Sequence, residues 1–337
     1  MERTLWYDQW CNILHSMGLF SFVYIIYIIT IANQFNSILI NYLNGKIKFH
    51  LGKITLNCNY FLFFYFLCNM SLYFSSLNSG SNGNCYFIGN HKDAVLVDAG
   101  ITCKEVERRL KSMDLSIKSI RAIFISHEHI DHIKGIEILV KNHNIPIYFT
   151  PKTYENSRLK IPDENKKYFN PLESIEIGSL KIKAFPKSHD AIDPCSFIIQ
   201  HEEHCVGVFT DIGNCCNHVI EHFKLCNAVF LEANYDQVML ENGPYPYHLK
   251  KRISGNEGHL SNEQALELFL NHSNENLEHL LLSHLSQENN DPELLMNIFN
   301  SKKGKTNIHI ASRHKPSPLF KLGVDKKMSF QQIKLFP

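Results

Sequence analysis

The stretch Ser126-His127-Glu128-His129-Ile130-Asp131-His132 constrains this chain more than any other part of it. It follows an apolar run, residues 122–125, that predicts a buried strand. It precedes residues 134–140, whose apolar spacing predicts a helix. Three imidazoles and one carboxylate therefore share one loop between a strand and a helix. A structural zinc normally has closed Cys and His ligation, whereas this loop mixes nitrogen and oxygen donors and suits two catalytic cations.

Length and composition allow a sizeable core but indicate no charged partner. The chain has 337 residues, 44% of them hydrophobic, and a formal net charge of +1. A charge so close to zero predicts no global attraction to nucleic acid or membrane, so binding of a polyanion would require a local basic patch on the protein. The 10 cysteines do not have the spacing of a small secreted disulfide framework. We therefore expect reduced thiols in a cytoplasmic protein.

Residues 1–69 differ from the rest of the chain. They contain two apolar segments, residues 19–32 and 60–68, and each is shorter than the roughly 20 residues of a membrane-spanning helix. A membrane hairpin is one interpretation. We favour the other, in which residues 1–69 are a hydrophobic extension outside the native product and translation starts at Met70. Residues 70–337 would then be the functional domain.

Strands outnumber helices in the rest of the chain, and the strand hairpins come in pairs. This pattern favours a two-sheet sandwich with helices outside, in one domain of about 260 residues. Ser261 and Gln264 have the spacing of a helix capping box. We expect residues 151–172 to be irregular and residues 245–252 to be a loop. The expected strands are 72–78, 85–89, 94–97, 122–125, 145–150, a hairpin over 174–185, 195–200, 205–210, 228–232, 277–283 and 306–311, and the expected helices are 104–113, 134–140, 261–271 and 292–299.

Polar residues recur at the carboxyl ends of the apolar strands. Function tends to lie on loops that a rigid scaffold positions, so the recurrence is informative. Any one of these residues alone is better explained as a turn former or an ordinary buried histidine. A two-metal site, however, needs more ligands than residues 127–132 supply, and the later strand ends provide them. The residues concerned are Asp98, His127, His189, Asp211, Glu232 and His284.

These motifs resemble those of the metallo-β-lactamase fold superfamily. The pattern His127-x-His129-x-Asp131-His132 follows a strand and an earlier Asp98, and His189, Asp211 and His284 come next in the order of the family. The resemblance covers residues 71–312 and implies an α+β fold, a four-layer αββα sandwich. Residues 72–84, 231–236, 251–253, 258–262 and 284–290 resemble the YycJ/WalJ-like subfamily in particular.

The resemblance also implies a role for each motif residue. Two divalent ions, Zn²⁺ foremost and Mn²⁺ as the alternative, would lie roughly 3.5–4 Å apart and share a hydroxide. Asp98 would orient the histidine loop rather than bind metal. The implied ligands are His127, His129 and His189 for one ion, Asp131, His132 and His284 for the other, and Asp211 between them.

The substrate residues are expected elsewhere in the chain. His259, in Gly258-His259-Leu260-Ser261, matches a histidine that in tRNA 3′-processing phosphodiesterases lies near the scissile phosphate and assists the leaving oxygen. The alternative for His259 is a structural role beside a helix. Residues 245–252 combine tyrosines with basic residues and could contact phosphates and stack bases, or be an ordinary solvated loop. Our candidates for substrate contact are Ser81, Asn84, Lys251 and Arg252, and for catalysis Asp98, Asp131 and His259.

The YycJ/WalJ-like subfamily is associated with exonuclease activity on DNA. The leading prediction is therefore a metal-dependent phosphodiesterase or nuclease that acts on DNA, with no obligate protein partner. An ester, thioester or lactone hydrolase of the same fold is the alternative enzyme and would have an enclosed apolar pocket without a basic rim. A metal-binding regulatory protein is the alternative outside the enzymes. β-Lactam hydrolysis is disfavoured because Asp211 stands where true lactamases commonly have a cysteine.

Overall fold

The computed structural model describes residues 38–43, 46–51, 54–59 and 71–323. The chain divides into two compact units, residues 68–325 and residues 1–67 together with 326–337. In the second of these units, β1 (Ile38–Leu43), β2 (Lys46–Leu51) and β3 (Ile54–Asn59) pair in that order as an antiparallel sheet.

The two apolar segments, residues 19–32 and 60–68, lie outside the described residues. Among the residues that are described, no helix is both long enough and apolar enough to cross a membrane. The proposal that the functional domain starts at Met70 stays a prediction.

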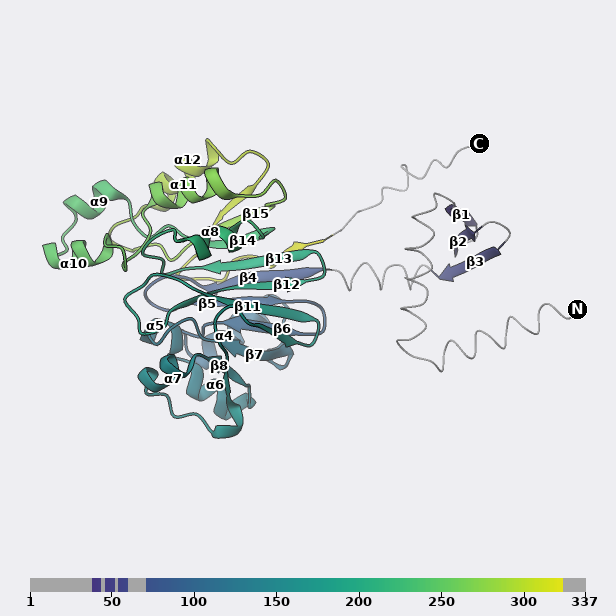
Figure 1. Ribbon diagram of the computed structural model, residues 1–337, viewed down its shortest axis with the longest axis horizontal. Coiled ribbons are helices and arrows are strands. Elements are labelled where there is room, and N and C mark those ends of the chain that lie inside the picture. The colour runs from purple at the N-terminus through teal and green to yellow at the C-terminus, as the bar shows by residue number, and fades with distance from the viewer. Residues whose placement is uncertain (1–37, 44–45, 52–53, 60–70, 324–337) are drawn as a thin grey trace, which may run out of the picture. The chain divides into compact units, whose positions relative to one another are not determined.

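Two seven-stranded sheets form the centre of residues 68–325 (Figure 1). The first sheet has the order β17 (Phe320–Leu322), β4 (Leu72–Asn78), β5 (Cys85–Gly89), β6 (Ala94–Val97), β7 (Ile120–Phe124), β8 (Ile147–Phe149), β9 (Lys166–Tyr168). The second has the order β10 (Ser174–Ile177), β11 (Leu180–Pro186), β12 (Cys195–His201), β13 (His204–Phe209), β14 (Ala228–Glu232), β15 (His279–Ser283), β16 (Asn307–Ile310). The runs β6 to β9 and β13 to β16 are parallel, and the other neighbours are antiparallel.

Helices cover the outer face of each sheet. In Figure 1, α6 and α7 lie at the bottom beside β8, while α11 and α12 lie above β13 to β15. The helices α9 and α10 extend to one side of the sandwich (Figure 1). The helix bounds are α4 (Cys103–Lys111), α5 (Ile130–Ile133), α6 (Ile136–His143), α7 (Pro151–Ser157), α8 (Asn217–Phe223), α9 (Gln237–Asn242), α10 (Tyr247–Ile253), α11 (Asn262–His272) and α12 (Pro292–Asn300).

Three buried apolar clusters hold these layers together. One lies between the sheets and contains Phe74 and Phe124 from the first sheet with Phe197 and Phe230 from the second. Another lies between the first sheet and the helices α4 and α6. The last joins the second sheet to α8, α11 and α12. The helices α4 and α6 on one side and α8, α11 and α12 on the other each bury an apolar face against a sheet, so the predicted αββα sandwich is confirmed.

Several local predictions were wrong for identifiable reasons. The helix expected over 134–140 is α6, but it begins only at Ile136, because Gly135 is its N-cap and donates its N–H to the carbonyl of Ala99; the short helix α5, which was not predicted, precedes it. Residues 151–172 are not irregular: Thr150 caps α7, Pro151 fills its first turn, and β9 pairs with β8. The capping box at the start of α11 is confirmed.

The two sheets bring their strand ends to the same edge of the sandwich. Asp98 follows β6 directly, Asp211 lies two residues beyond β13, and His284 follows β15 directly. All three have a left-handed backbone conformation, with φ of 61°, 55° and 55°. Side chains other than glycine rarely adopt this conformation, and it concentrates at functional sites where the surrounding structure enforces it.

Candidate metal centre

Three histidines from two loops form the first part of the site. His127 follows β7, His129 precedes α5, and His189 follows β11. One ligand atom from each lies within 4.8 Å of the others. His127 Nε2 is 3.1 Å from His129 Nδ1, and the ring of His189 is 4.9 Å from that of His127. The structure thus brings together the three histidines predicted to share one metal ion.

Asp211 lies at the centre of the remaining candidates. Its carboxylate oxygens are 3.3 Å from His132 Nε2, 3.2 Å from His284 Nδ1 and 3.9 Å from His189 Nε2. No other carboxylate among the described residues contacts both predicted ligand sets. This position agrees with the bridging role that the resemblance implied.

The second predicted set is more open. Asp131 Oδ2 lies 3.5 Å from His132 Nε2 and 3.9 Å from His284 Nε2, while the rings of His132 and His284 are 6.2 Å apart. The tight groups on this side are instead His127, His132 and Asp211, and Asp211, Glu232, His259 and His284. Glu232 and His259, which are not among the ligands that the resemblance implied, are thus further neighbours of Asp211.

The carboxylate of Asp98 fixes the histidine loop, residues 126–132, through hydrogen bonds. Its buried carboxylate accepts hydrogen bonds from the backbone N–H and the hydroxyl of Ser126, both at 2.8 Å, and lies 2.7 Å from His132 Nδ1. The Ser126 hydroxyl is also 2.8 Å from His127 Nδ1. Asp98 and Ser126 thus fix the Nδ1 side of two histidines and leave Nε2 for a ligand, which is how carboxylates orient metal-binding imidazoles.

Glu232 is the functional residue to which the sequence assigned no role. Its Oε1 lies 2.8 Å from Nδ1 of both His259 and His284, and its Oε2 accepts from the N–H groups of Ile212 and Leu260. A fully buried carboxylate at the end of the apolar strand β14 needs such partners. That position, a carboxylate that closes an all-apolar strand, was the available signal.

The donor set fits a divalent metal. His189 Nδ1 contacts the carbonyl of Gly258 at 3.1 Å and His284 Nδ1 contacts Glu232, so the second nitrogen of each ring faces the site. Both of these Nε2 atoms are buried and have no hydrogen-bond partner among the described residues. Buried polar atoms without partners are costly. Cations bound between each of these nitrogens and the Asp211 carboxylate would satisfy them.

Burial and neighbouring charges shift the pKa values of the site residues in different directions. Burial would raise the pKa of Asp211, but His284 and His132 outweigh it and hold that pKa well below its usual range. Burial lowers the pKa of His189 to about 4, so this ring is neutral near pH 7. For His259, Glu232 outweighs burial and raises the pKa. The site thus combines ionised carboxylates with a neutral ligand histidine and a histidine that favours its protonated form.

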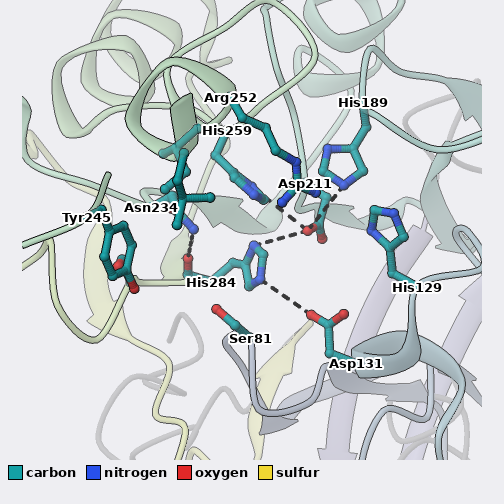
Figure 2. A pocket seen from close by; sticks show the side chains of 13 residues that line it. Ser81, His129, Asp131, His189, Asp211, Asn234, Tyr245, Arg252, His259 and His284 are labelled. Carbon is teal, nitrogen blue, oxygen red and sulfur yellow. Dashed lines mark hydrogen bonds and ion pairs between the residues drawn. The ribbon is translucent and has the colours of Figure 1, made fainter. Parts of the chain in front are cut away.

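A cavity of about 240 Å³ opens onto these groups (Figure 2). Of the residues predicted to contact substrate, Ser81 and Arg252 line it, and Lys251 does not. Asn84 is fully buried, and its amide nitrogen lies 3.3 Å from Asp131 Oδ2 and 3.1 Å from His132 Nε2. The structure places Asn84 under the histidine loop, away from the cavity. The lining residues are Ser81, His129, Asp131, His189, Asp211, Asn234, Tyr245, Leu249, Arg252, Ile253, His259, His284 and Ser286.

One wall of the cavity is helix α10, where we expected a loop. Leu249 and Ile253, four residues apart on one face of the helix, line the cavity together with Arg252. The guanidinium of Arg252 is paired with Asp190 at 2.5 Å and its side chain is 57% exposed. Tyr247, at the start of the helix, is 74% exposed. The prolines before the helix made this segment look like a loop, but Pro246 is only its N-cap.

Comparisons with known proteins agree with this geometry. The β-lactamase superfamily domain matches residues 93–284. The chain is 34% identical over 228 residues to exodeoxyribonuclease YycJ of Bacillus anthracis, an alignment that covers 67% of this chain and 86% of that protein. It is 32% identical over 226 residues to exodeoxyribonuclease WalJ of Streptococcus pneumoniae, which covers 66% of this chain and 84% of that protein. The solved structure of the metallo-β-lactamase fold protein YhfI from Bacillus subtilis matches with a TM-score of 0.59 at 16% identity, over 75% of this chain and 100% of that one.

The chain belongs to the metallo-β-lactamase superfamily and is a metal-dependent hydrolase. Within that superfamily, its identity to the two relatives places it in the YycJ/WalJ-like group. The resemblance on which the predicted fold and enzyme class were based is thereby confirmed.

Proposed function

We propose that this protein is a binuclear metal-dependent phosphodiesterase that degrades DNA as an exonuclease. The observation that carries the proposal is the convergence of both predicted ligand sets on Asp211 at the floor of one polar cavity. The two similar relatives are both named exodeoxyribonucleases, and this supports DNA as the substrate.

The proposed ligands divide around Asp211. His127, His129 and His189 would hold one ion, and Asp131, His132 and His284 the other, with Zn²⁺ as the first choice and Mn²⁺ as the alternative. When bound, two such ions supply a water of lowered pKa and neutralise charge on the phosphate oxygens. Asp98 and Glu232 do not reach the substrate in this scheme and keep the imidazoles in place.

His259 would act on the leaving group. Its Nδ1 is held by Glu232, its side chain is 18% exposed, and it lines the cavity. A histidine in this position can donate a proton to the oxygen that leaves phosphorus, a step in which general acids contribute about 10²–10⁴-fold. Arg252 would contact a phosphate of the bound strand once that phosphate replaces Asp190 as its partner.

The walls of the cavity favour a phosphodiester over the alternative substrates. An ester or lactone hydrolase was expected to have an enclosed apolar pocket without a basic rim. Here an arginine stands in the wall, and the floor consists of histidines and carboxylates. Tyr247, on the exposed side of α10, offers a ring on which a base could stack.

A substrate panel tests the proposal. The full chain, loaded with Mn²⁺ or Zn²⁺, would be offered linear DNA, RNA, bis(p-nitrophenyl) phosphate, a lactone and a thioester. We expect hydrolysis of the phosphodiesters, progressive shortening of DNA from an end, and no turnover of the lactone or thioester. Preferred turnover of a lactone or thioester would replace the nuclease proposal with the alternative enzyme.

A pair of aspartate variants assigns the activity to this site. Asp211→Ala removes the central carboxylate and should lower the rate at least about 10²-fold, with a loss of bound metal and unchanged circular dichroism. Asp163→Ala is the matched control, because Asp163 pairs only with Lys166 at the surface and its side chain is 96% exposed. Full activity of Asp211→Ala would contradict the binuclear mechanism.

A further inference from the structure

A second cluster of metal-ligand atoms lies in the outer helical layer. Cys103 Sγ is 3.7 Å from Glu107 Oε1, and His143 Nε2 is 2.7 Å from the same oxygen. One ligand atom of each residue lies within 4.8 Å of the other two. None of the three belongs to the candidate metal centre, and nothing in the proposed hydrolysis uses them.

The fold brings these residues together from two helices. Cys103 and Glu107 lie four residues apart on α4 and so share one face of it, and His143 is the last residue of α6. The two helices pack against each other over a common apolar cluster that includes Cys103, Val106 and Leu139 (Figure 1). The cluster therefore sits on a rigid helix pair rather than on a loop.

We propose that Cys103, Glu107 and His143 form a peripheral zinc site that ties α4 to α6. A thiolate, a carboxylate and an imidazole are the three ligand types that Zn²⁺ takes in proteins, and hard cations such as Mg²⁺ and Ca²⁺ avoid the sulfur. Cys103 is buried, whereas the side chains of Glu107 and His143 are 41% and 22% exposed. The site is thus open to solvent on one side, where water completes the tetrahedron.

One of the distances between ligand atoms already fits a bound ion, and a second requires a small movement. Ligand atoms at about 2.0–2.3 Å from a tetrahedral ion lie roughly 3.3–3.8 Å from one another. The separation of Cys103 Sγ from Glu107 Oε1 already has this value. The contact between Glu107 and His143 is a hydrogen bond in the present structure. The Glu107 oxygen must therefore move away from His143 by about 0.6–1 Å, and its partly exposed side chain leaves room for that movement.

One neighbour of the sulfur could stabilise a metal-bound thiolate. The Asn142 amide nitrogen lies 3.8 Å from Cys103 Sγ, so a donor is available to a charged sulfur. The thiol now donates to Glu107, and burial raises its pKa. Binding of Zn²⁺ breaks the S–H bond, forms the Zn–S bond and releases the proton to solvent. No electrons are transferred, so no oxidant or reductant is required.

The position of the site gives it a structural role. Helix α4 begins five residues after Asp98, and α6 begins four residues after His132. The two loops are already joined by the bond from the Ala99 N–H to the His132 carbonyl. A zinc ion between α4 and α6 would hold together the two helices that carry these loops. This role is independent of the proposed DNA substrate.

Cobalt spectroscopy tests the proposal on the full chain. The protein would be stripped with a chelator and titrated with Co²⁺ while its near-ultraviolet absorption is recorded. A thiolate bound to Co²⁺ gives a charge-transfer band, and the candidate metal centre contains no cysteine that could produce one. We expect such a band in the wild type and its displacement by Zn²⁺. Absence of the band, with Co²⁺ bound at the other centre, would reject the site and leave an ordinary His143–Glu107 ion pair.

Two cysteine variants identify the ligand. Cys103→Ser should abolish the thiolate band and lower the zinc content, measured by elemental analysis, by one ion per chain. Cys216→Ser is the control, because Cys216 is a half-buried thiol that belongs to no group of metal ligands among the described residues, and it should keep both. A band that survives in Cys103→Ser would overturn the assignment.

A histidine variant keeps the proposal testable if Cys103→Ser fails to fold. His143→Gln leaves the thiol and its buried surroundings intact and removes one nitrogen ligand. We expect the thiolate band to appear only at higher Co²⁺ concentration than in the wild type. An unchanged titration would remove His143 from the site. Because these readouts are spectroscopic and analytical, they do not depend on whether the protein cleaves DNA.

Discussion

The floor and the wall of the cavity are built in different ways. The floor includes two buried histidines whose rings each have an orienting contact, the carbonyl of Gly258 for His189 and Glu232 for His284. The wall is helix α10, in which no residue is buried and whose Arg252 is paired with Asp190. The floor is thus held by buried contacts, whereas the wall is exposed.

This difference suggests a division of labour. Orienting contacts to ligand histidines set metal affinity and reaction rate, so substitutions on the floor should change kcat and metal content. The exposed basic and aromatic side chains of the wall can contact a DNA strand without touching the phosphate that is hydrolysed. Substitutions there should change KM and the dependence on salt. Three variants, ordered by expected effect, test this division.

His259 lies between the two regions and gives the largest expected effect. It is held by Glu232 on the floor but is partly exposed in the cavity. His259→Ala should lower kcat by about 10²-fold or more, because a proton donor to the leaving oxygen is lost, and should leave metal content unchanged. Steady-state kinetics and elemental analysis measure both quantities.

The control for that variant is His272→Ala, at the end of α11, which removes a histidine outside every metal-ligand group among the described residues. His259 is also a neighbour of Asp211 in one of those groups. If His259→Ala loses a metal ion, His259 is a metal ligand rather than a proton donor to the leaving oxygen.

Glu232→Gln tests the floor itself. The amide keeps the shape of the side chain but loses the charge that orients two histidines. Metal affinity should therefore fall about 10–100-fold, measured by titration against a chelator. A variant with unchanged affinity but raised KM would show that Glu232 serves the wall instead.

The charge of Glu232 also affects the stability of the metal-free protein. Burial would raise its pKa, but His259 and His284 outweigh burial and lower the pKa from 4.5 to about 2. A carboxyl whose pKa is lowered on folding stabilises the protein above its unfolded pKa and loses that contribution as pH falls towards the folded value. Acid unfolding between about pH 4.5 and 2 should accordingly be shallower in Glu232→Gln than in the wild type.

The sequence predicted the floor far better than the wall, for a physical reason. Strand-end ligands follow apolar runs whose burial is evident from composition, and parallel strands must end at one edge. The end of β14 was visible in the same way, but the role of Glu232 depends on which histidines approach it in space. Helix α10 has neither a long apolar stripe nor a side-chain cap, and Pro244 and Pro246 hid it.

The substrate candidates separate for the same reason. Asn84 and Ser81 share one polar loop, but Asn84 is fully buried and Ser81 reaches the cavity. The backbone N–H of Asn84 donates to the carbonyl of Asp131, and a Cβ on Gly100 would lie 1.6 Å from that same carbonyl oxygen. Such close backbone packing draws Asn84 inward, and it cannot be read from residue type.

The smallest expected effect comes from the wall. Arg252→Ala should raise KM for DNA about tenfold and leave kcat and metal content unchanged, because it removes one phosphate contact of about 1–2 kcal/mol. The slope of log affinity against log salt should fall by about 1. Arg121→Ala is the matched control, because Arg121 pairs with Asp93 away from the cavity and its side chain is 53% exposed. If Arg252→Ala behaves like Arg121→Ala, helix α10 does not bind the DNA strand through Arg252. If only kcat falls, Arg252 acts on the reaction rate, as the residues of the floor do.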